Sequence, residues 1–373
     1  MPAPQEIPLE PHLKPAQQTA PPTSALIPPI SSAPAAAALA EEFREGGQQV
    51  QVVRLTADSG ATAEILPGIS GTVRSFKAGG EKELLVYPPG EYTFARGIPA
   101  PFFFFGGRIV GGKFKWKGQG KDLTPYLDDK RIRKDADGNA LHGLQFPWEV
   151  DSSAVVQDSQ TGRQGATTTL TYDASKNRIF REVFDQGDKH ASAKLKLTYT
   201  IIGDDFAIEY SIKNDGQVDI PNYTNIHPWI NTDGKPVAVS LPASERIIYE
   251  NHVRVGQEPA TGEYDFRTEP KKIDGAYEEV FKARGDGENK AVSTLILPDK
   301  TEVEVTQDVR EFPYVKVWVN PKLNVASIQP LSDNIGSFTQ AAEPTCDIIP
   351  PNEERKWAVK MKVKRPKPEM LAP

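Results

Sequence analysis

Alternation of apolar and polar residues with a period of two dominates the chain between residues 48 and 364. Such alternation predicts β-strands that bury one face. Turn residues separate the segments, as at Gly203-Asp204-Asp205 and Asn214-Asp215-Gly216. No segment with a helical period longer than ten residues lies between them. The clearest strand segments are residues 49–55, 166–172, 194–202, 206–212, 292–297, 302–306, 314–319 and 356–363.

Many closely spaced strands without intervening helices predict an all-β fold, an antiparallel sandwich or barrel. The segment 48–364 is too long for an immunoglobulin-type sandwich of about 100 residues. One very large sandwich and two stacked β domains both remain open at this point.

The two ends of the chain differ in composition from this body. Ten prolines lie in residues 1–34, a composition typical of a disordered or polyproline-like segment. Residues 35–43 (AAAALAEEF) have the best helical composition in the chain, so residues 1–47 are predicted to form a disordered arm with a short helix. Residues 365–373 are again proline-rich and predicted to be a loose tail. The start resembles no secretory signal, which predicts a cytoplasmic protein.

Composition excludes several function classes. The 44 basic and 50 acidic residues give a net charge of −6, which argues against a nucleic-acid partner. A single cysteine, Cys346, excludes an internal disulfide framework and a cysteine-cluster metal site. No stretch approaches the roughly 18 apolar residues of a membrane helix, so no membrane partner is expected.

Two of the five histidines have unusual settings. His142 lies in Asn139–Gly143 (NALHG), and His227 lies in Asn225-Ile226-His227-Pro228-Trp229. Both are flanked by turn residues and aromatic residues. Aromatic faces suit the C–H surfaces of sugars, and imidazoles donate to or accept from hydroxyls. A structural role as loop histidines remains the alternative.

These segments, taken in order, resemble the aldose 1-epimerase (galactose mutarotase) family. Residues 101–116 (PFFFFGGRIVGGKFKW) and 139–143 resemble its first signature, and residues 225–234 (NIHPWINTDG) resemble the second. Residues 277–281 (YEEVF) occupy the place of a short acidic-aromatic motif, and residues 326–330 (ASIQP) with 350–359 resemble the last strands. The resemblance implies a large antiparallel β-supersandwich of the galactose mutarotase-like type.

The resemblance also implies cofactor-free and metal-free isomerase chemistry on a hexose. A carboxylate removes the proton of the anomeric hydroxyl, an acid protonates the ring oxygen, and the opened ring closes on its other face. By position, His227 would be the acid, since a histidine pKa near 6.5 allows both protonation states. His142 would hold the ring oxygen or a hydroxyl. Arg108, Trp229, Glu278 and Asn225 would bind the substrate, although Arg108 and Glu278 also suit surface ion pairs.

The chain departs from the family at the general base. The family has a glutamate before the proline of the late strand, and this chain has Gln329 before Pro330. A glutamine amide keeps the shape of glutamate but takes no proton near neutral pH. Because general acid–base catalysis typically contributes ~10²–10⁴-fold, its loss predicts weak turnover. The chain would then be a sugar-binding relative, unless another carboxylate such as Asp333 or Glu343 serves as base.

Two further alternatives remain open. The basic run Lys130-Arg131-Ile132-Arg133-Lys134 could bind the phosphate of a hexose phosphate, or it could be a solvated loop, since Asp128, Asp129, Asp135 and Asp137 bracket it. The sandwich could also be a scaffold for interactions of the proline-rich arm.

Overall fold

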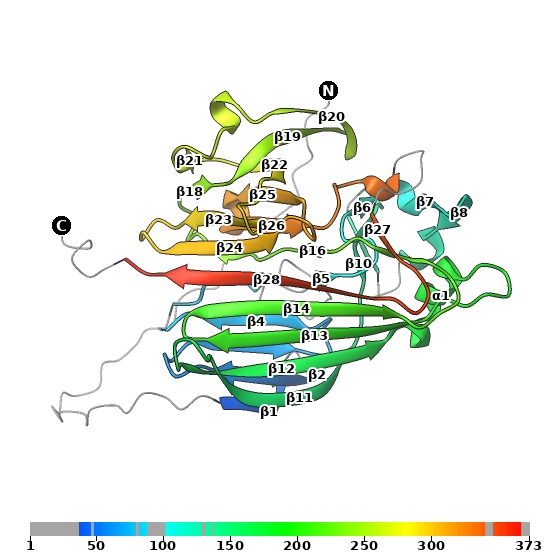
Figure 1. Cartoon of the computed structure of the whole chain (residues 1–373), viewed down its shortest axis with the longest axis horizontal. Helices are drawn as coiled ribbons and strands as arrows, with labels where there is room; N and C mark the ends of the chain where they lie inside the picture. The colour runs from blue at the N-terminus through cyan, green and yellow to red at the C-terminus, as the bar shows by residue number, and fades with distance from the viewer. Residues whose placement is uncertain are drawn as a thin grey trace, which may run out of the picture. The chain divides into compact units, whose positions relative to one another are not determined.

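Antiparallel strands make up nearly all of the regular structure (Figure 1). The structure is a computed structural model. It describes residues 37–45, 48–79, 82–87, 101–127, 132–135, 137–339 and 346–366, all within one of the chain's two compact units. Every strand pair among these residues is antiparallel, and the predicted all-β class is confirmed.

A nine-stranded sheet forms the largest layer, and it contains six of the eight predicted strand segments.

 The other two predicted segments, residues 49–55 and 314–319, belong to a four-stranded and an eight-stranded sheet. Strand β28 lies between β14 and β24 in the middle of the sheet (red in Figure 1). In order, the strands are β11 (Glu149–Gln157), β12 (Gln164–Asp173), β13 (Ala193–Ile202), β14 (Asp205–Asn214), β28 (Glu354–Lys364), β24 (Glu302–Asp308), β23 (Lys290–Ile296), β18 (Val237–Ser240) and β21 (Lys271–Ile273).

A four-stranded sheet packs against one end of this layer. It consists of β1 (Ala37–Glu45), β2 (Gln48–Thr56), β3 (Thr62–Leu66) and β4 (Thr72–Lys77). Strand β2 contacts β12 and β13, and the Phe76 ring lies 5.2 Å from that of Phe206. The short helix predicted within residues 35–43 is wrong, since residues 37–45 form a strand that pairs along its whole length with β2. Pairing with a neighbouring strand here overrides the helical propensity of alanine.

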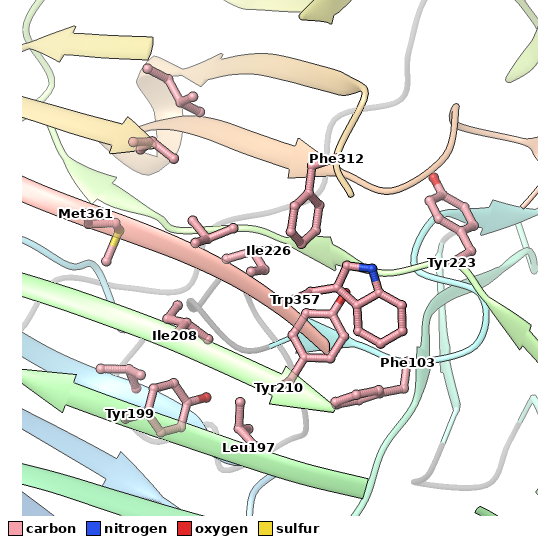
Figure 2. Close-up of a cluster of buried hydrophobic side chains, with 14 of the residues drawn as sticks. Phe103, Leu197, Tyr199, Ile208, Tyr210, Tyr223, Ile226, Phe312, Trp357 and Met361 are labelled. Atoms are coloured by element: carbon pink, nitrogen blue, oxygen red, sulfur yellow. The ribbon is translucent and has the colours of Figure 1, made fainter. Parts of the chain in front are cut away.

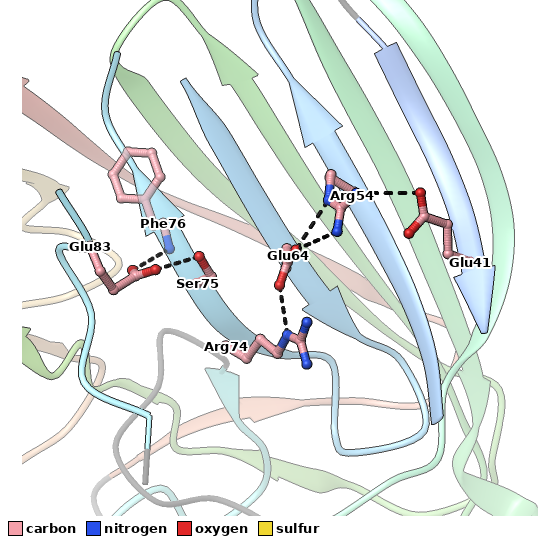
Figure 3. A network of polar contacts seen from close by, with 7 residues as sticks. All are labelled: Glu41, Arg54, Glu64, Arg74, Ser75, Phe76 and Glu83. Carbon is pink, nitrogen blue, oxygen red and sulfur yellow. Dashed lines mark hydrogen bonds and ion pairs between the residues drawn. The ribbon is translucent and has the colours of Figure 1, made fainter. Parts of the chain in front are cut away.

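The outer face of this four-stranded sheet carries an ionic network (Figure 3). Glu64 accepts hydrogen bonds from Arg54 at 2.8 Å and from Arg74 at 2.6 Å, and Arg54 also reaches Glu41 at 3.4 Å. Arg54 lies between the buried residues Val53 and Leu55, and alternation along the strand therefore turns it away from the core.

An eight-stranded sheet carries Gln329, and His227 lies in the loop between two of its strands. Its central pair is β25 and β26, and the short strand β16 extends it beside β26. In order, the strands are β20 (Val253–Pro259), β19 (Ala243–Glu250), β22 (Tyr277–Ala283), β25 (Tyr314–Asn320), β26 (Val325–Leu331), β16 (Asn225–Ile226) and β5 (Pro101–Phe102), with β17 (Ile230–Asn231) also paired to β26.

Smaller elements complete the described chain. One α-helix, α1 (Arg178–Phe184), is present in the described residues, and the Asn177 side chain caps it. Sequence analysis did not predict this helix. The small sheets are β6 (Arg108–Ile109), β10 (Ala140–Leu144) and β9 (Ile132–Lys134); β7 (Lys113–Trp116) and β8 (Gln119–Asp122); and β15 (Ile220–Asn222) and β27 (Asp347–Ile349). The 3₁₀ helices are Val110–Gly112, Thr124–Tyr126, Ala174–Lys176, Gly262–Tyr264, Pro321–Leu323 and Ser337–Thr339.

Aromatic side chains fill the core where β14 and β28 meet the loop after β5 (Figure 2). The Tyr210 and Trp357 rings stack 4.8 Å apart, and Phe103 lies edge-on to Tyr210 at 5.4 Å. Phe103 also lies 5.4 Å from Trp148, and all four rings are buried. Large rings packed at these distances hold the sheet layers together.

Candidate functional site

His142 projects from an irregularity in β10. The pairing with β9 shifts register between Leu141 and Leu144, and both His142 and Gly143 have positive φ, at 60° and 70°. Such a bulge changes the direction of a side chain, and glycine adopts this conformation without steric cost. The His142 amide donates to the Gly107 carbonyl at 3.0 Å, which fixes the bulge beside β6.

His227 lies in the loop between β16 and β17 and meets His142 there. The two imidazole rings are 5.8 Å apart and nearly perpendicular. The Trp229 indole donates to His227 Nε2 at 3.2 Å. Because an indole N–H can only donate, Nε2 accepts and the proton of the ring resides on Nδ1.

Two tryptophans border His227. The Trp318 ring on β25 lies 5.3 Å from the His227 ring and 5.5 Å from Trp229. Trp318 was not predicted as a site residue. Its place in an alternating strand gave no local signal, because its contact with His227 depends on strand pairing.

Asn225 and Gln329 form the polar part of the same region. Asn225 Nδ2 donates to Gln329 Oε1 at 3.4 Å and to the Gly106 carbonyl at 3.4 Å. Both side chains are buried, and Gln329 is only 1% exposed. Asn225 Oδ1, Gln329 Nε2 and Ser327 Oγ are buried and have no hydrogen-bond partner among the described residues. Buried polar atoms without partners are rare, so this cluster has unused capacity to bind polar groups.

Glu278 forms an ion pair with Lys316, which lies on the sheet face that carries Gln329. Lys316 is directly opposite Gln329 in the β25–β26 pairing, and directly paired residues share a face. Its ammonium lies 2.5 Å from the Glu278 carboxylate on β22. The charge of Lys316 lowers the pKa of Glu278 below its ordinary value. The carboxylate is therefore ionised near neutral pH and is a weak base.

Arg108 lies beside the histidine pair, since it is paired with Leu141, the neighbour of His142. Arg108 Nε is 2.9 Å from the Asp135 carboxylate, and Nη1 is 2.6 Å from His252 Nδ1. Sequence analysis missed His252 and the role of Asp135. The signal that could have marked His252 is its place in Asn251-His252, a two-residue turn between two segments with strand-like alternation.

The structure thus brings His142, His227 and Trp229 into ring contact, and it joins Asn225 to Gln329 by a hydrogen bond. Arg108 and Glu278 flank this group and engage Asp135 and Lys316 in ion pairs. Donors, acceptors and aromatic faces at one place are suited to a neutral polyhydroxyl ligand.

The other sequence hypotheses have mixed outcomes. Asp333 is buried just after β26, and Asn334 donates to it at 2.7 Å. Glu343, Lys130 and Arg131 lie outside the described residues, and the rest of the basic run forms β9. Within the described residues, no group of three or more His, Cys, Asp or Glu side chains could hold a metal ion. No helix in that part of the chain is long and apolar enough to span a membrane.

Comparison with known proteins identifies relatives of this chain. A family model described as aldose 1-epimerase matches residues 51–362. A galactose mutarotase-like protein from Clostridium acetobutylicum is 17% identical, with a TM-score of 0.69 over 88% of this chain and 99% of that one. A galactose 1-epimerase from Lactobacillus acidophilus is 15% identical, with a TM-score of 0.65 over 89% and 100%. A comparison with curated proteins finds no match. The predicted galactose mutarotase-like fold is thereby confirmed.

Proposed function

Because the chain belongs to the aldose 1-epimerase family, we propose that it binds a hexose at the site around His142, His227, Asn225 and Gln329. The Trp229 and Trp318 rings offer aromatic faces for the C–H surface of a sugar. The imidazoles and the two amides offer donors and acceptors for its hydroxyls. The unpartnered buried atoms of Asn225 and Gln329 support this assignment.

In the bound complex, each side chain has a distinct task. His227 carries its proton on Nδ1 and donates toward the ring oxygen. His142, 5.8 Å away between ring centres, holds a neighbouring hydroxyl. Arg108 and Glu278 bind hydroxyls at the border of the site, where each keeps its ion-pair partner.

Gln329 makes binding, with slow or absent anomer interconversion, the function that the site supports best. Its Oε1 already accepts a hydrogen bond from Asn225, and an amide takes no proton near neutral pH. Glu278 is no substitute, because Lys316 holds it ionised with a lowered pKa. The single observation that carries this proposal is the buried Asn225–Gln329 amide pair beside the two histidines.

The second candidate is an active aldose 1-epimerase that uses another base. The contact between the His142 and His227 rings favours it, since an imidazole can serve as the general acid. Polarimetry on freshly dissolved glucose and galactose separates the two candidates. Saturation-transfer NMR with a monosaccharide panel, including a hexose 6-phosphate, tests binding itself.

We expect hexose signals in the NMR experiment and mutarotation close to the uncatalysed rate. Rapid mutarotation would favour the second candidate. Absence of binding across the panel would contradict both.

A further inference from the structure

The turn between β19 and β20 holds a histidine where glycine is favoured. Glu250 pairs with Val253, so Asn251 and His252 form a two-residue loop. Their φ angles are 49° and 64°. Two consecutive residues with positive φ define the type I′ turn, for which Asn-Gly is the preferred sequence. A histidine in this conformation is strained, and such strain is concentrated at functional sites.

This turn places the His252 ring against Arg108, which is 144 residues away in sequence. Arg108 Nη1 is 2.6 Å from Nδ1 and 2.5 Å from Nε2 of the ring. A guanidinium can only donate, so it needs an acceptor on the ring, which a neutral imidazole has and a protonated one lacks. Arg108 Nε also lies 2.9 Å from the Asp135 carboxylate in an ion pair, so the guanidinium has a partner on two sides.

Four charged groups from other elements surround His252. Arg108 on β6 and Lys316 on β25 are positive, and Asp135 after β9 and Glu278 on β22 are negative. Partial burial and then the charge of Arg108 lower the pKa of His252. Acidification therefore places a second positive charge beside Arg108 and removes its acceptor.

His252 also borders space for a ligand. Together with Glu278, Tyr249 and Val280 it lines a cavity of about 480 Å³. Val280 is paired with Lys316, which in turn is paired with Gln329. The cavity thus adjoins the sheet face that carries the proposed hexose site.

We propose that His252 is a positioning residue for hexose binding. By accepting a hydrogen bond from Arg108, it orients the guanidinium so that the remaining N–H groups face the sugar hydroxyls. This inference rests on the proposed function, because it names the part of the same site that orients Arg108.

Two substitutions test the proposal. His252→Gly gives the preferred Asn-Gly turn but removes the acceptor, and His252→Asn tolerates positive φ and keeps an oxygen acceptor that cannot be protonated. The assay is titration of a hexose that binds the wild type, at pH 8 and pH 5, with melting temperature measured in parallel. The control is His190→Asn, since His190 is exposed and bonded to Asp185.

We expect His252→Gly to melt no lower than the wild type while binding about tenfold more weakly, as loss of a hydrogen bond to a charged group implies. Wild-type affinity should fall at pH 5. His252→Asn should bind well at pH 8 and show a smaller fall at pH 5, since the imidazoles of His142 and His227 remain in the site, while His190→Asn should show the same fall as the wild type.

The outcomes that overturn the two proposals are different. If the wild type binds a hexose and His252→Gly binds it equally well, the positioning role is wrong and the proposed function stands. If His252→Gly does not fold, a His252→Asn variant with an unchanged pH profile overturns the role. If the wild type binds no hexose, the proposed function fails and the positioning role fails with it.

Discussion

Lys316 and Gln329 are directly opposite each other on β25 and β26, and the Lys316 ammonium is bound to Glu278 at 2.5 Å. The position at which the family has its carboxylate base is thus a neutral amide in this chain. The negative charge that balances Lys316 comes from Glu278 on β22 and not from position 329.

The first prediction concerns Gln329→Glu. Glutamate has the shape of glutamine, so we expect normal folding and a carboxylate beside His142 and His227. Mutarotation followed by polarimetry should rise ~10²–10⁴-fold, the usual contribution of a general base. Because Lys316 is opposite, it should stabilise the new charge and hold the gain toward the lower end.

The companion variant Gln329→Glu with His227→Asn serves as the control for this prediction. It should lose most of the gain, since acid and base act as a unit. A Gln329→Glu protein that binds hexose without any gain in mutarotation would show that His227 is not placed as the acid.

The second prediction concerns Lys316→Met, which keeps the aliphatic stem and removes the ammonium. The pKa of Glu278, measured by NMR titration, should rise toward its ordinary value because its main stabilising charge is gone. A lowered folded-state pKa stabilises the fold above the unfolded-state pKa, and this stability is lost as pH falls through the folded-state pKa.

Lys316→Met should remove that acid-dependent contribution. Glu278 is 59% exposed, so the loss in unfolding free energy at pH 7 should be at most about 1 kcal/mol. Lys272→Met, which breaks the exposed pair with Asp274, is the matched control and should leave Glu278 unchanged. An unchanged Glu278 pKa in Lys316→Met would contradict the ion pair.

The third prediction concerns Glu64→Gln in the network of Figure 3. Burial opposes ionisation of Glu64, but hydrogen bonds from Arg74 and Arg54 outweigh it and lower the pKa. Chemical denaturation at pH 7 should show a loss of about 1–3 kcal/mol. The loss should shrink as pH falls through the folded-state pKa of Glu64, where the wild type is protonated as well.

Glu41→Gln is the control for Glu64→Gln. Glu41 is 47% exposed and reaches Arg54 at 3.4 Å, so its loss should cost less than about 1 kcal/mol. Equal effects of the two variants would contradict the central role of Glu64.

The fourth prediction concerns Phe103→Ala in the aromatic core of Figure 2. Removal of a buried ring that contacts Tyr210 and Trp148 should cost about 3–5 kcal/mol in unfolding free energy. Val155→Ala, at a side chain that is 53% exposed, should change stability by no more than about 0.5 kcal/mol. A Phe103→Ala protein as stable as the control would contradict the packing described.

The sequence predicted the strands well because alternation directly reflects burial on one face, as in β13 and β14. It failed at residues 37–45, where pairing with β2 outweighs alanine propensity, and at α1, which is only seven residues long. Short elements have little periodic signal, and their conformation is decided by neighbours distant in sequence.

The candidate site was predictable where a local motif marks a residue, as at His142 and His227. Lys316 and His252 carry no such mark. Lys316 matters because β25 pairs with both β22 and β26, and His252 matters because a turn brings it to Arg108. These relationships arise only when the sheets assemble.

The central place of β28 in the nine-stranded sheet has a consequence for biosynthesis. Strands β14 and β24 both pair with β28, which follows them in the chain. Until the ribosome has released β28, each of these strands presents an open edge that can pair with another nascent chain. Assembly of the sheet must therefore wait for late translation, and truncation before residue 354 should yield insoluble protein in place of a smaller folded one.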